Sequence, residues 1–176
     1  YTYCKLLAIK ELSKKTSTKV VNALKDVLTN EKEYYGIRYE AAKALGNIGT
    51  NEAKRALLEA LPHIKDKRVR IGIAEALGNF KDKESFNTLK EILLNKEEGD
   101  ITRSRAAWSL GKTKIKDAIP VLKEALKIPS YIDTIKRGAL MGLAEIRGDE
   151  AFEIIKKHAK EDPFYLTRST AISCLG

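Results

Sequence analysis

Histidine and cysteine are the side chains that most often build metal sites and nucleophilic centres, and this chain of 176 residues has two of each. His63 stands in the stretch LPHIKD and His158 in KKHAKED. A helical zinc site of the His-Glu-x-x-His type needs two histidines four residues apart, because that spacing places both imidazoles on one face. Neither histidine has such a companion, so the sequence predicts no metal ligand and no zinc in this segment.

The two cysteines offer no chemistry either. Cys4 and Cys174 lie at opposite ends of the chain, so they do not form the closely spaced set that a disulfide framework needs. This cysteine usage indicates a reducing, cytoplasmic setting. The sequence has no nucleophile elbow, phosphate-binding loop or cluster of metal-binding cysteines. It also has no signal peptide and no apolar run near the roughly 20 residues that span a bilayer. We therefore expect no catalytic residue, cofactor or membrane contact in this segment.

A basic residue recurs every 32 or 33 residues and could bind an anion. The column consists of Lys5, Arg38, Arg70, Arg103, Lys136 and Arg168. Each member falls in the first turn of a predicted helix, where a positive charge opposes the helix dipole and needs a partner. Acidic residues that stand just before the column could supply one: Asp66, Asp100, Asp133 and Asp162. We interpret the column as a structural ladder of ion pairs and carbonyl contacts between repeats; the alternative is a row that binds a ligand.

The sequence of the helix that carries this column recurs several times along the chain. IRYEAAKALGNIG covers residues 37–49, and VRIGIAEALGNF covers residues 69–80. Seven residues after each basic residue comes a leucine: Leu12, Leu45, Leu77, Leu110, Leu143 and Leu175. The next residue is small in every copy and is most often glycine, which suits a helix carboxyl cap. A fixed period of this kind is typical of a repeat protein.

A second helix with its own apolar columns lies between these copies. Its first column is Leu24, Leu57, Leu89, Leu122 and Ile155, and its second is Leu28, Leu61, Leu93, Leu126 and Ala159. The four-residue separation places each pair on one helical face. Because one helical pair cannot bury its apolar stripe alone, neighbouring pairs must stack. The sequence predicts an all-α fold, an α-solenoid (α–α superhelix) of about five and a half helical-hairpin repeats, as a single repeat domain over residues 1–176.

The pattern V-R-x-x-A-A-x-A-L-G resembles HEAT repeats of the phycobilin-lyase-like type over essentially the whole chain. A narrower resemblance rests on landmarks that do not repeat: residues 34–36 (YYG), 111–113 (GKT) and 129–131 (PSY). With the order of the copies, they resemble the carboxyl-terminal HEAT-like region of aminopeptidase N-type zinc metallopeptidases. This resemblance implies a non-catalytic scaffold that packs on a separate catalytic domain and restricts substrate access. It also implies that the segment belongs to a larger protein whose zinc lies in that other domain.

Two other functions are open. One is a stand-alone adaptor that binds a protein or peptide in a concave groove. The other is a nucleic-acid binder, since 33 Lys and Arg against 24 Asp and Glu give a net charge of +9. The lysines, however, are spread beside glutamates, as in NEKEYY and NKEEGD, and the chain has no glutamine. That composition is typical of a solvated thermophile surface, so we favour a protein partner over nucleic acid.

By the HEAT resemblance, the helices that carry the basic column line the concave side. Outward positions on them change type at every repeat, and five form a candidate contact surface: Tyr39, Arg105, Trp108, Arg137 and Met141. Aromatic residues and arginine are enriched among interface anchors. The alternative is that Trp108 covers small neighbours such as Gly138 and only packs into the groove wall. The contact hypothesis predicts that Trp108→Ala keeps its helical content and melting behaviour.

Overall fold

The chain is entirely helical where the structure describes it. The computed structural model describes residues 2–176, and in that range it contains eleven α-helices, two short 3-10 helices and no strand. The predicted all-α α-solenoid is therefore confirmed. The packing divides the chain into two compact units, Tyr1–Phe80 and Lys81–Gly176.

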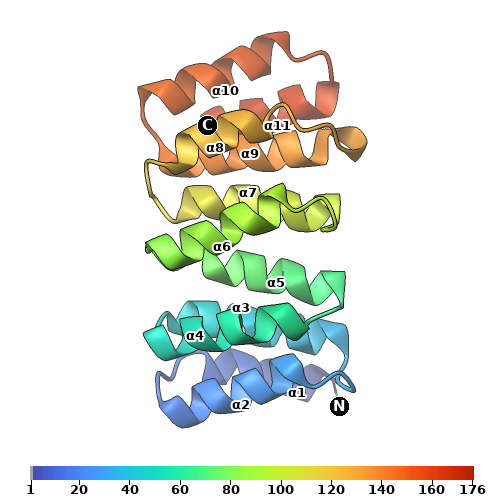
Figure 1. Ribbon diagram of the computed structural model, residues 1–176, viewed down its shortest axis with the longest axis vertical. Coiled ribbons are helices and arrows are strands. Elements are labelled where there is room, and N and C mark those ends of the chain that lie inside the picture. Colours follow the sequence, from blue (N-terminus) through green and yellow to red (C-terminus); the bar gives the residue numbers. More distant parts are fainter. Residues whose placement is uncertain (1) are drawn as a thin grey trace. The chain divides into compact units, whose positions relative to one another are not determined.

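The first unit, Tyr1–Phe80, holds the helices α1 to α5. Their bounds are α1 Thr2–Leu12, α2 Thr18–Thr29, α3 Tyr35–Ile48, α4 Asn51–Ala60, the 3-10 helix η1 Leu61–His63, and α5 Lys67–Leu77. α3 packs against both α1 and α5, and α2 packs against α4 and α3. Within this unit the odd-numbered helices therefore form one layer and the even-numbered helices a second (Figure 1).

The second unit, Lys81–Gly176, repeats this arrangement with the helices α6 to α11. Their bounds are α6 Lys83–Leu94, α7 Asp100–Lys112, α8 Ala118–Ala125, the 3-10 helix η2 Tyr131–Asp133, α9 Thr134–Ile146, α10 Asp149–Glu161 and α11 Tyr165–Leu175. α9 packs against both α7 and α11, and α6 packs against α8. Successive odd-numbered helices are again neighbours, so residues at equivalent repeat positions lie on adjacent helices (Figure 1).

The leucine columns are buried in both units. Side chains with 0% of their surface exposed include Leu24, Leu45, Leu57, Leu77, Leu89, Leu110, Leu122 and Leu143. Removing these apolar side chains from water is the main favourable contribution to folding. The outermost members differ: Leu12 is half-buried and Leu175 is 37% exposed. In the described residues, each belongs to a helix that packs on only one other odd-numbered helix.

Two of the glycines that follow the leucines are packing sites rather than helix caps, which corrects the expectation from sequence. Gly46 lies inside α3 and Gly111 inside α7. A Cβ on Gly46 would lie 2.7 Å from the Cα of Ala76, and one on Gly111 would lie 1.9 Å from the carbonyl oxygen of Gly142. The cap of α3 is instead Gly49, with a left-handed φ of 68°. Glycine inside these helices lets the next odd-numbered backbone approach within contact distance.

Candidate functional site

The arginines of the basic column reach back to the end of the preceding even-numbered helix. Arg38, at the start of α3, donates a hydrogen bond from Nε to the carbonyl of Leu28 over 2.9 Å. Arg103, at the start of α7, donates from Nε to the carbonyl of Leu93 over 2.8 Å. These leucines lie in the last turns of α2 and α6, where carbonyls lack an intrahelical partner. Both arginines are buried, with 6% and 8% of their surface exposed.

Two further arginines of the column make the same kind of contact. Arg70 donates from Nη1 to the carbonyl of Leu61 over 2.7 Å, and Arg168 donates from Nη1 to the carbonyl of Asp162 over 2.8 Å. Leu61 and Asp162 are the carboxyl caps of α4 and α10. A guanidinium at the negative end of a helix dipole is stabilising, which offsets its unfavourable place in the first turn of its own helix.

The two lysines of the column use carboxylates. Lys5 Nζ lies 2.5 Å from Glu33 Oε2, which precedes α3. Lys136 Nζ lies 2.8 Å from Asp133 Oδ2 and 3.4 Å from Asp162 Oδ2. Lysine and arginine therefore join consecutive helical pairs by different contacts at equivalent positions. The four arginines, from Arg38 to Arg168, reach backbone carbonyls, and the two lysines bind acidic side chains.

The other two aspartates that the sequence offered as partners have further contacts of their own. Asp66 binds Arg68 through both carboxylate oxygens, at 3.1 Å from Nε and 2.7 Å from Nη2. Hydrogen bonds from Arg68 outweigh burial and lower the pKa of Asp66 to about 2. The guanidinium of Arg68 also lies 3.6 Å from the ring centre of Tyr35. Asp100 Oδ2 accepts a hydrogen bond from the backbone N–H of Tyr131 over 3.0 Å.

Asp162 is the centre of a polar network between α9, α10 and α11. Its side chain is 2% exposed, and its Oδ2 lies 2.9 Å from His158 Nδ1 as well as near Lys136. Its Oδ1 accepts the backbone N–H of Phe164 over 3.0 Å. Burial raises the pKa of Asp162, but the hydrogen bonds from His158, Phe164 and Lys136 outweigh it and leave the pKa below its usual value.

This network predicts a loss of stability in acid. A carboxyl whose folded pKa is lowered stabilises the fold above its unfolded pKa, about 3.9 for aspartate, and this contribution is lost as the pH falls through the folded value. Urea unfolding at pH 7 and at about pH 3 should therefore show a larger stability loss for the parent chain than for Asp162→Asn. An equal loss in both proteins would contradict the role given to Asp162.

Trp108 lies on the outward side of α7 and is held by polar contacts. Its Nε1 donates to Glu145 Oε1 of α9 over 3.3 Å. The Arg105 guanidinium and the Lys112 ammonium lie 5.4 and 5.1 Å from its ring, within range of cation–π attraction. Lys114 Nζ lies 3.1 Å from Glu145 Oε2 and also donates to the Glu145 carbonyl. We name Arg105, Trp108, Lys112 and Glu145 the Trp108 cluster.

The other predicted contact residues occupy related positions. In the first unit, Tyr39 donates from its hydroxyl to Glu75 Oε2 over 2.6 Å, which joins α3 to α5. In the second unit, Arg137 donates from Nε to Thr170 Oγ1 over 2.9 Å, which joins α9 to α11. Met141 is half-buried on α9. Tyr39 and Arg137 therefore link consecutive odd-numbered helices, and all three residues still present part of their surface to solvent.

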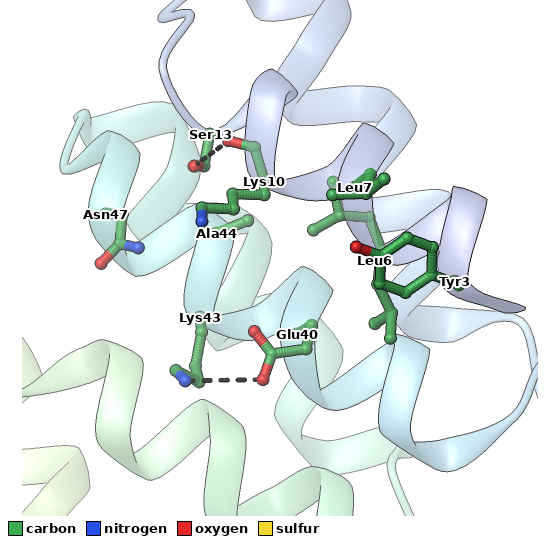
Figure 2. A pocket seen from close by; sticks show the side chains of 10 residues that line it. Tyr3, Leu6, Leu7, Lys10, Ser13, Glu40, Lys43, Ala44 and Asn47 are labelled. Atoms are coloured by element: carbon green, nitrogen blue, oxygen red, sulfur yellow. Dashed lines mark hydrogen bonds and ion pairs between the residues drawn. The ribbon is translucent and has the colours of Figure 1, made fainter.

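The first unit has an open pocket between α1 and α3 (Figure 2). Its volume is about 400 Å³, and it is lined by Tyr3, Leu6, Leu7, Ile9, Lys10, Ser13, Glu40, Lys43, Ala44 and Asn47. Lys43 Nζ lies 3.5 Å from Glu40 Oε1 across the α3 side of the pocket. The pocket thus lies on outward positions of the same repeat columns that carry Tyr39 and Trp108 in later copies.

The histidines and cysteines belong to no cluster of metal ligands in the described residues. His63 ends the 3-10 helix η1 and is exposed, whereas His158 contacts Asp162 as described. Cys4 is exposed and Cys174 is half-buried. In residues 2–176, no group of three or more His, Cys, Asp or Glu side chains could hold a metal ion. No helix in the same range is long and apolar enough to cross a membrane.

The family model for HEAT repeats matches the chain three times, over residues 2–71, 37–110 and 99–176. The chain belongs to the HEAT-repeat family. The part of the earlier resemblance that named HEAT repeats is confirmed, and the chain is a HEAT-repeat helical scaffold. No curated protein sequence matches it.

Two solved structures share this HEAT-repeat fold. The complex of CpcE and CpcF of phycocyanin lyase from Nostoc sp. PCC7120 is similar with a TM-score of 0.64 and 22% identity, over 98% of this chain and 68% of that chain. Human deoxyhypusine hydroxylase in complex with glycerol is similar with a TM-score of 0.51 and 18% identity, over 99% of this chain and 79% of that chain. At these identities the similarity describes the fold.

Sequence reasoning missed the acidic residues that hold the outward side chains of these HEAT repeats. Glu75 follows Tyr39 by 36 residues, and Glu145 follows Trp108 by 37. This separation in sequence equals one repeat plus one helical turn. It therefore places the carboxylate on the next odd-numbered helix, beside the aromatic side chain. A search for acidic residues at this offset from each outward aromatic residue would have found both.

Proposed function

We propose that this HEAT-repeat chain is a non-catalytic scaffold that binds a protein partner through the outward side of its odd-numbered helices. The Trp108 cluster carries the proposal. It presents the only tryptophan of the chain, half-buried, with the cations of Arg105 and Lys112 beside the ring. Tryptophan and arginine are the residue types that most often dominate the binding energy of protein interfaces.

Contacts between helices prepare this surface for binding. The hydrogen bond from Trp108 to Glu145 fixes the indole relative to α9, and the bond from Arg137 to Thr170 fixes the guanidinium relative to α11. A side chain that is already ordered loses less conformational entropy when a partner binds. The similar solved structure that contains CpcE and CpcF is itself a complex of two proteins, which supports a partner of this class.

A narrower proposal concerns the protein to which the scaffold belongs. The sequence landmarks at residues 34–36, 111–113 and 129–131 resemble those of aminopeptidase N-type zinc metallopeptidases. In such an enzyme the partner would be its own catalytic domain, which would hold the zinc, and the scaffold would limit access to it. The coding sequence upstream of the Tyr1 codon tests this: a His-Glu-x-x-His motif is expected there. A start codon directly upstream, without that motif, would favour the adaptor.

Trp108→Ala tests whether the indole belongs to a surface or to the core. Because Trp108 is half-buried and its partners are polar, we expect unchanged helical content by circular dichroism. We also expect a loss of about 1 kcal/mol or less, equivalent to a few degrees in the melting temperature of a chain this size. A loss of helical structure at 25 °C would show that Trp108 is a core residue and would remove the anchor of the proposal.

A further inference from the structure

The close contact between α7 and α9 brings outward side chains of both helices together. A Cβ on Gly142 of α9 would lie 2.5 Å from the carbonyl oxygen of Ala107 of α7. Trp108 follows Ala107 on α7, and Met141 precedes Gly142 at the equivalent repeat position of α9. Trp108 and Met141 are therefore neighbours on adjacent helices, and both are half-buried. They form the apolar centre of an outward surface in the second unit.

The charged side chains around this centre are mostly positive. The Arg105 guanidinium and the Lys112 ammonium lie 5.4 and 5.1 Å from the ring of Trp108. The one carboxylate of the Trp108 cluster, Glu145, lies 3.1 Å from Lys114 Nζ, which neutralises it. The surface therefore keeps an excess of positive charge beside its apolar centre.

Arg137 adds a pair of hydrogen-bond donors to this surface. It is half-buried on α9, one helical turn before Met141, and its Nε donates to Thr170 Oγ1 over 2.9 Å. Within the described residues, neither Nη atom of Arg137 makes a hydrogen bond or ion pair. The bond to Thr170 thus orients the guanidinium and leaves Nη1 and Nη2 for a ligand. Two parallel N–H groups of this kind match the two oxygens of a carboxylate.

The same repeat columns carry different charges in the first unit. Their outward residues there include two acids, Glu40 and Glu75, and the cation Lys43 lies 3.5 Å from Glu40. A nucleic acid binds best along a continuous basic stripe, which columns of alternating charge do not provide. A protein segment needs only a carboxylate next to an apolar side chain, and the second unit offers a match for both. Charge complementarity therefore favours an acidic protein segment.

We propose that the surface around Trp108 binds an acidic segment of a protein partner, with a carboxylate on Nη1 and Nη2 of Arg137 and an apolar side chain on Trp108 and Met141. This inference rests on the proposed function, which requires a protein at Trp108 but does not define its chemistry. Opposite charges across such an interface select the partner and speed its association.

Fluorescence of Trp108 provides the test, because it is the only tryptophan of the chain. The full chain is titrated with a short peptide of alternating leucine and glutamate, which contains no tryptophan. We expect a saturable change in emission, and an affinity about tenfold or more lower when glutamine replaces the glutamates. Arg137→Gln should weaken binding of the glutamate peptide by about fivefold or more.

Lys157→Gln is the matched control for Arg137→Gln. It removes the same charge from an exposed residue of α10, in the other layer of helices. The affinity should change by less than about twofold, because exposed charges far from a ligand are screened by salt. Circular dichroism of both variants excludes unfolding as the cause of any difference.

Several results would overturn the acidic segment. They are no saturable change at millimolar peptide, equal affinities for the glutamate and glutamine peptides, or equal effects of Arg137→Gln and Lys157→Gln. Duplex DNA that displaces the peptide at a lower concentration than the peptide itself requires would assign these cations to nucleic acid. Photocrosslinking from position 108 depends on contact and not on charge. An adduct with a protein there, without a preference for the glutamate peptide, would overturn this inference and leave the proposed function standing.

Discussion

Gly111→Ala should destabilise the second unit by about 2–4 kcal/mol, the largest effect expected of any single methyl group in this chain. The added Cβ would lie 1.9 Å from the carbonyl oxygen of Gly142 and 2.6 Å from its Cα. Both are backbone atoms, so α7 and α9 must separate along their contact. Alanine is the better helix former by about 1 kcal/mol, and the clash must exceed that gain. Urea unfolding followed by circular dichroism measures the difference.

Gly176→Ala is the matched control for this substitution. It adds the same methyl group where no atom beyond its neighbour in the chain lies within 4 Å of the new Cβ. We expect a change within about 0.5 kcal/mol. If Gly111→Ala were instead more stable than the parent chain, the glycine would affect stability only through its low helix propensity. That result would contradict the close contact between α7 and α9.

Arg103→Met should cost about 2–3 kcal/mol. Methionine keeps much of the side-chain length but leaves the carbonyl of Leu93 without its donor, in a place where Arg103 is only 8% exposed. An unsatisfied buried carbonyl costs about 1–3 kcal/mol, and the lost charge at the end of α6 adds to it. Thermal and urea unfolding both report this loss.

Arg105→Met, two residues later on the same helix, is the control for Arg103→Met. Arg105 is half-buried and lies beside Trp108 on the outward side. We expect a stability change within about 0.5 kcal/mol and a loss of partner binding instead. Equal destabilisation by the two substitutions would contradict the distinction between a ladder that joins helices and an outward surface that binds.

The fold was predictable because its causes are local and repeated. The sequence of one copy predicts only a weakly amphipathic helix, but an unbroken leucine column in six copies defines the buried face. Leu45 and Leu110, two members of this column, are fully buried. The roles of single residues within that frame were harder to predict. Gly46 and Gly111 resemble helix caps by position, and only the approach of a second backbone shows that they are packing sites.

The candidate sites were less predictable, because they depend on which side chains meet across helices. The sequence located the basic column and predicted ion pairs and carbonyl contacts for it, but it did not identify which carbonyl each arginine reaches, because a backbone carbonyl such as that of Leu93 has no signature in a sequence. The pocket between α1 and α3 was missed for a similar reason. Leu6, Leu7 and Lys10 line this pocket, and a hollow beside them depends on how α1 lies against α3.

Site-specific photocrosslinking tests the central claim most directly. p-Benzoylphenylalanine replaces Trp108 on α7 in one protein and Phe152, a 48% exposed aromatic residue of α10, in another. Both are expressed in the source cells as part of the complete gene product and irradiated. We predict a covalent adduct with a protein, or with another domain of the same protein, from position 108 and none from position 152. An adduct from position 152 alone would place the partner on the even-numbered helices and contradict a contact surface at Trp108.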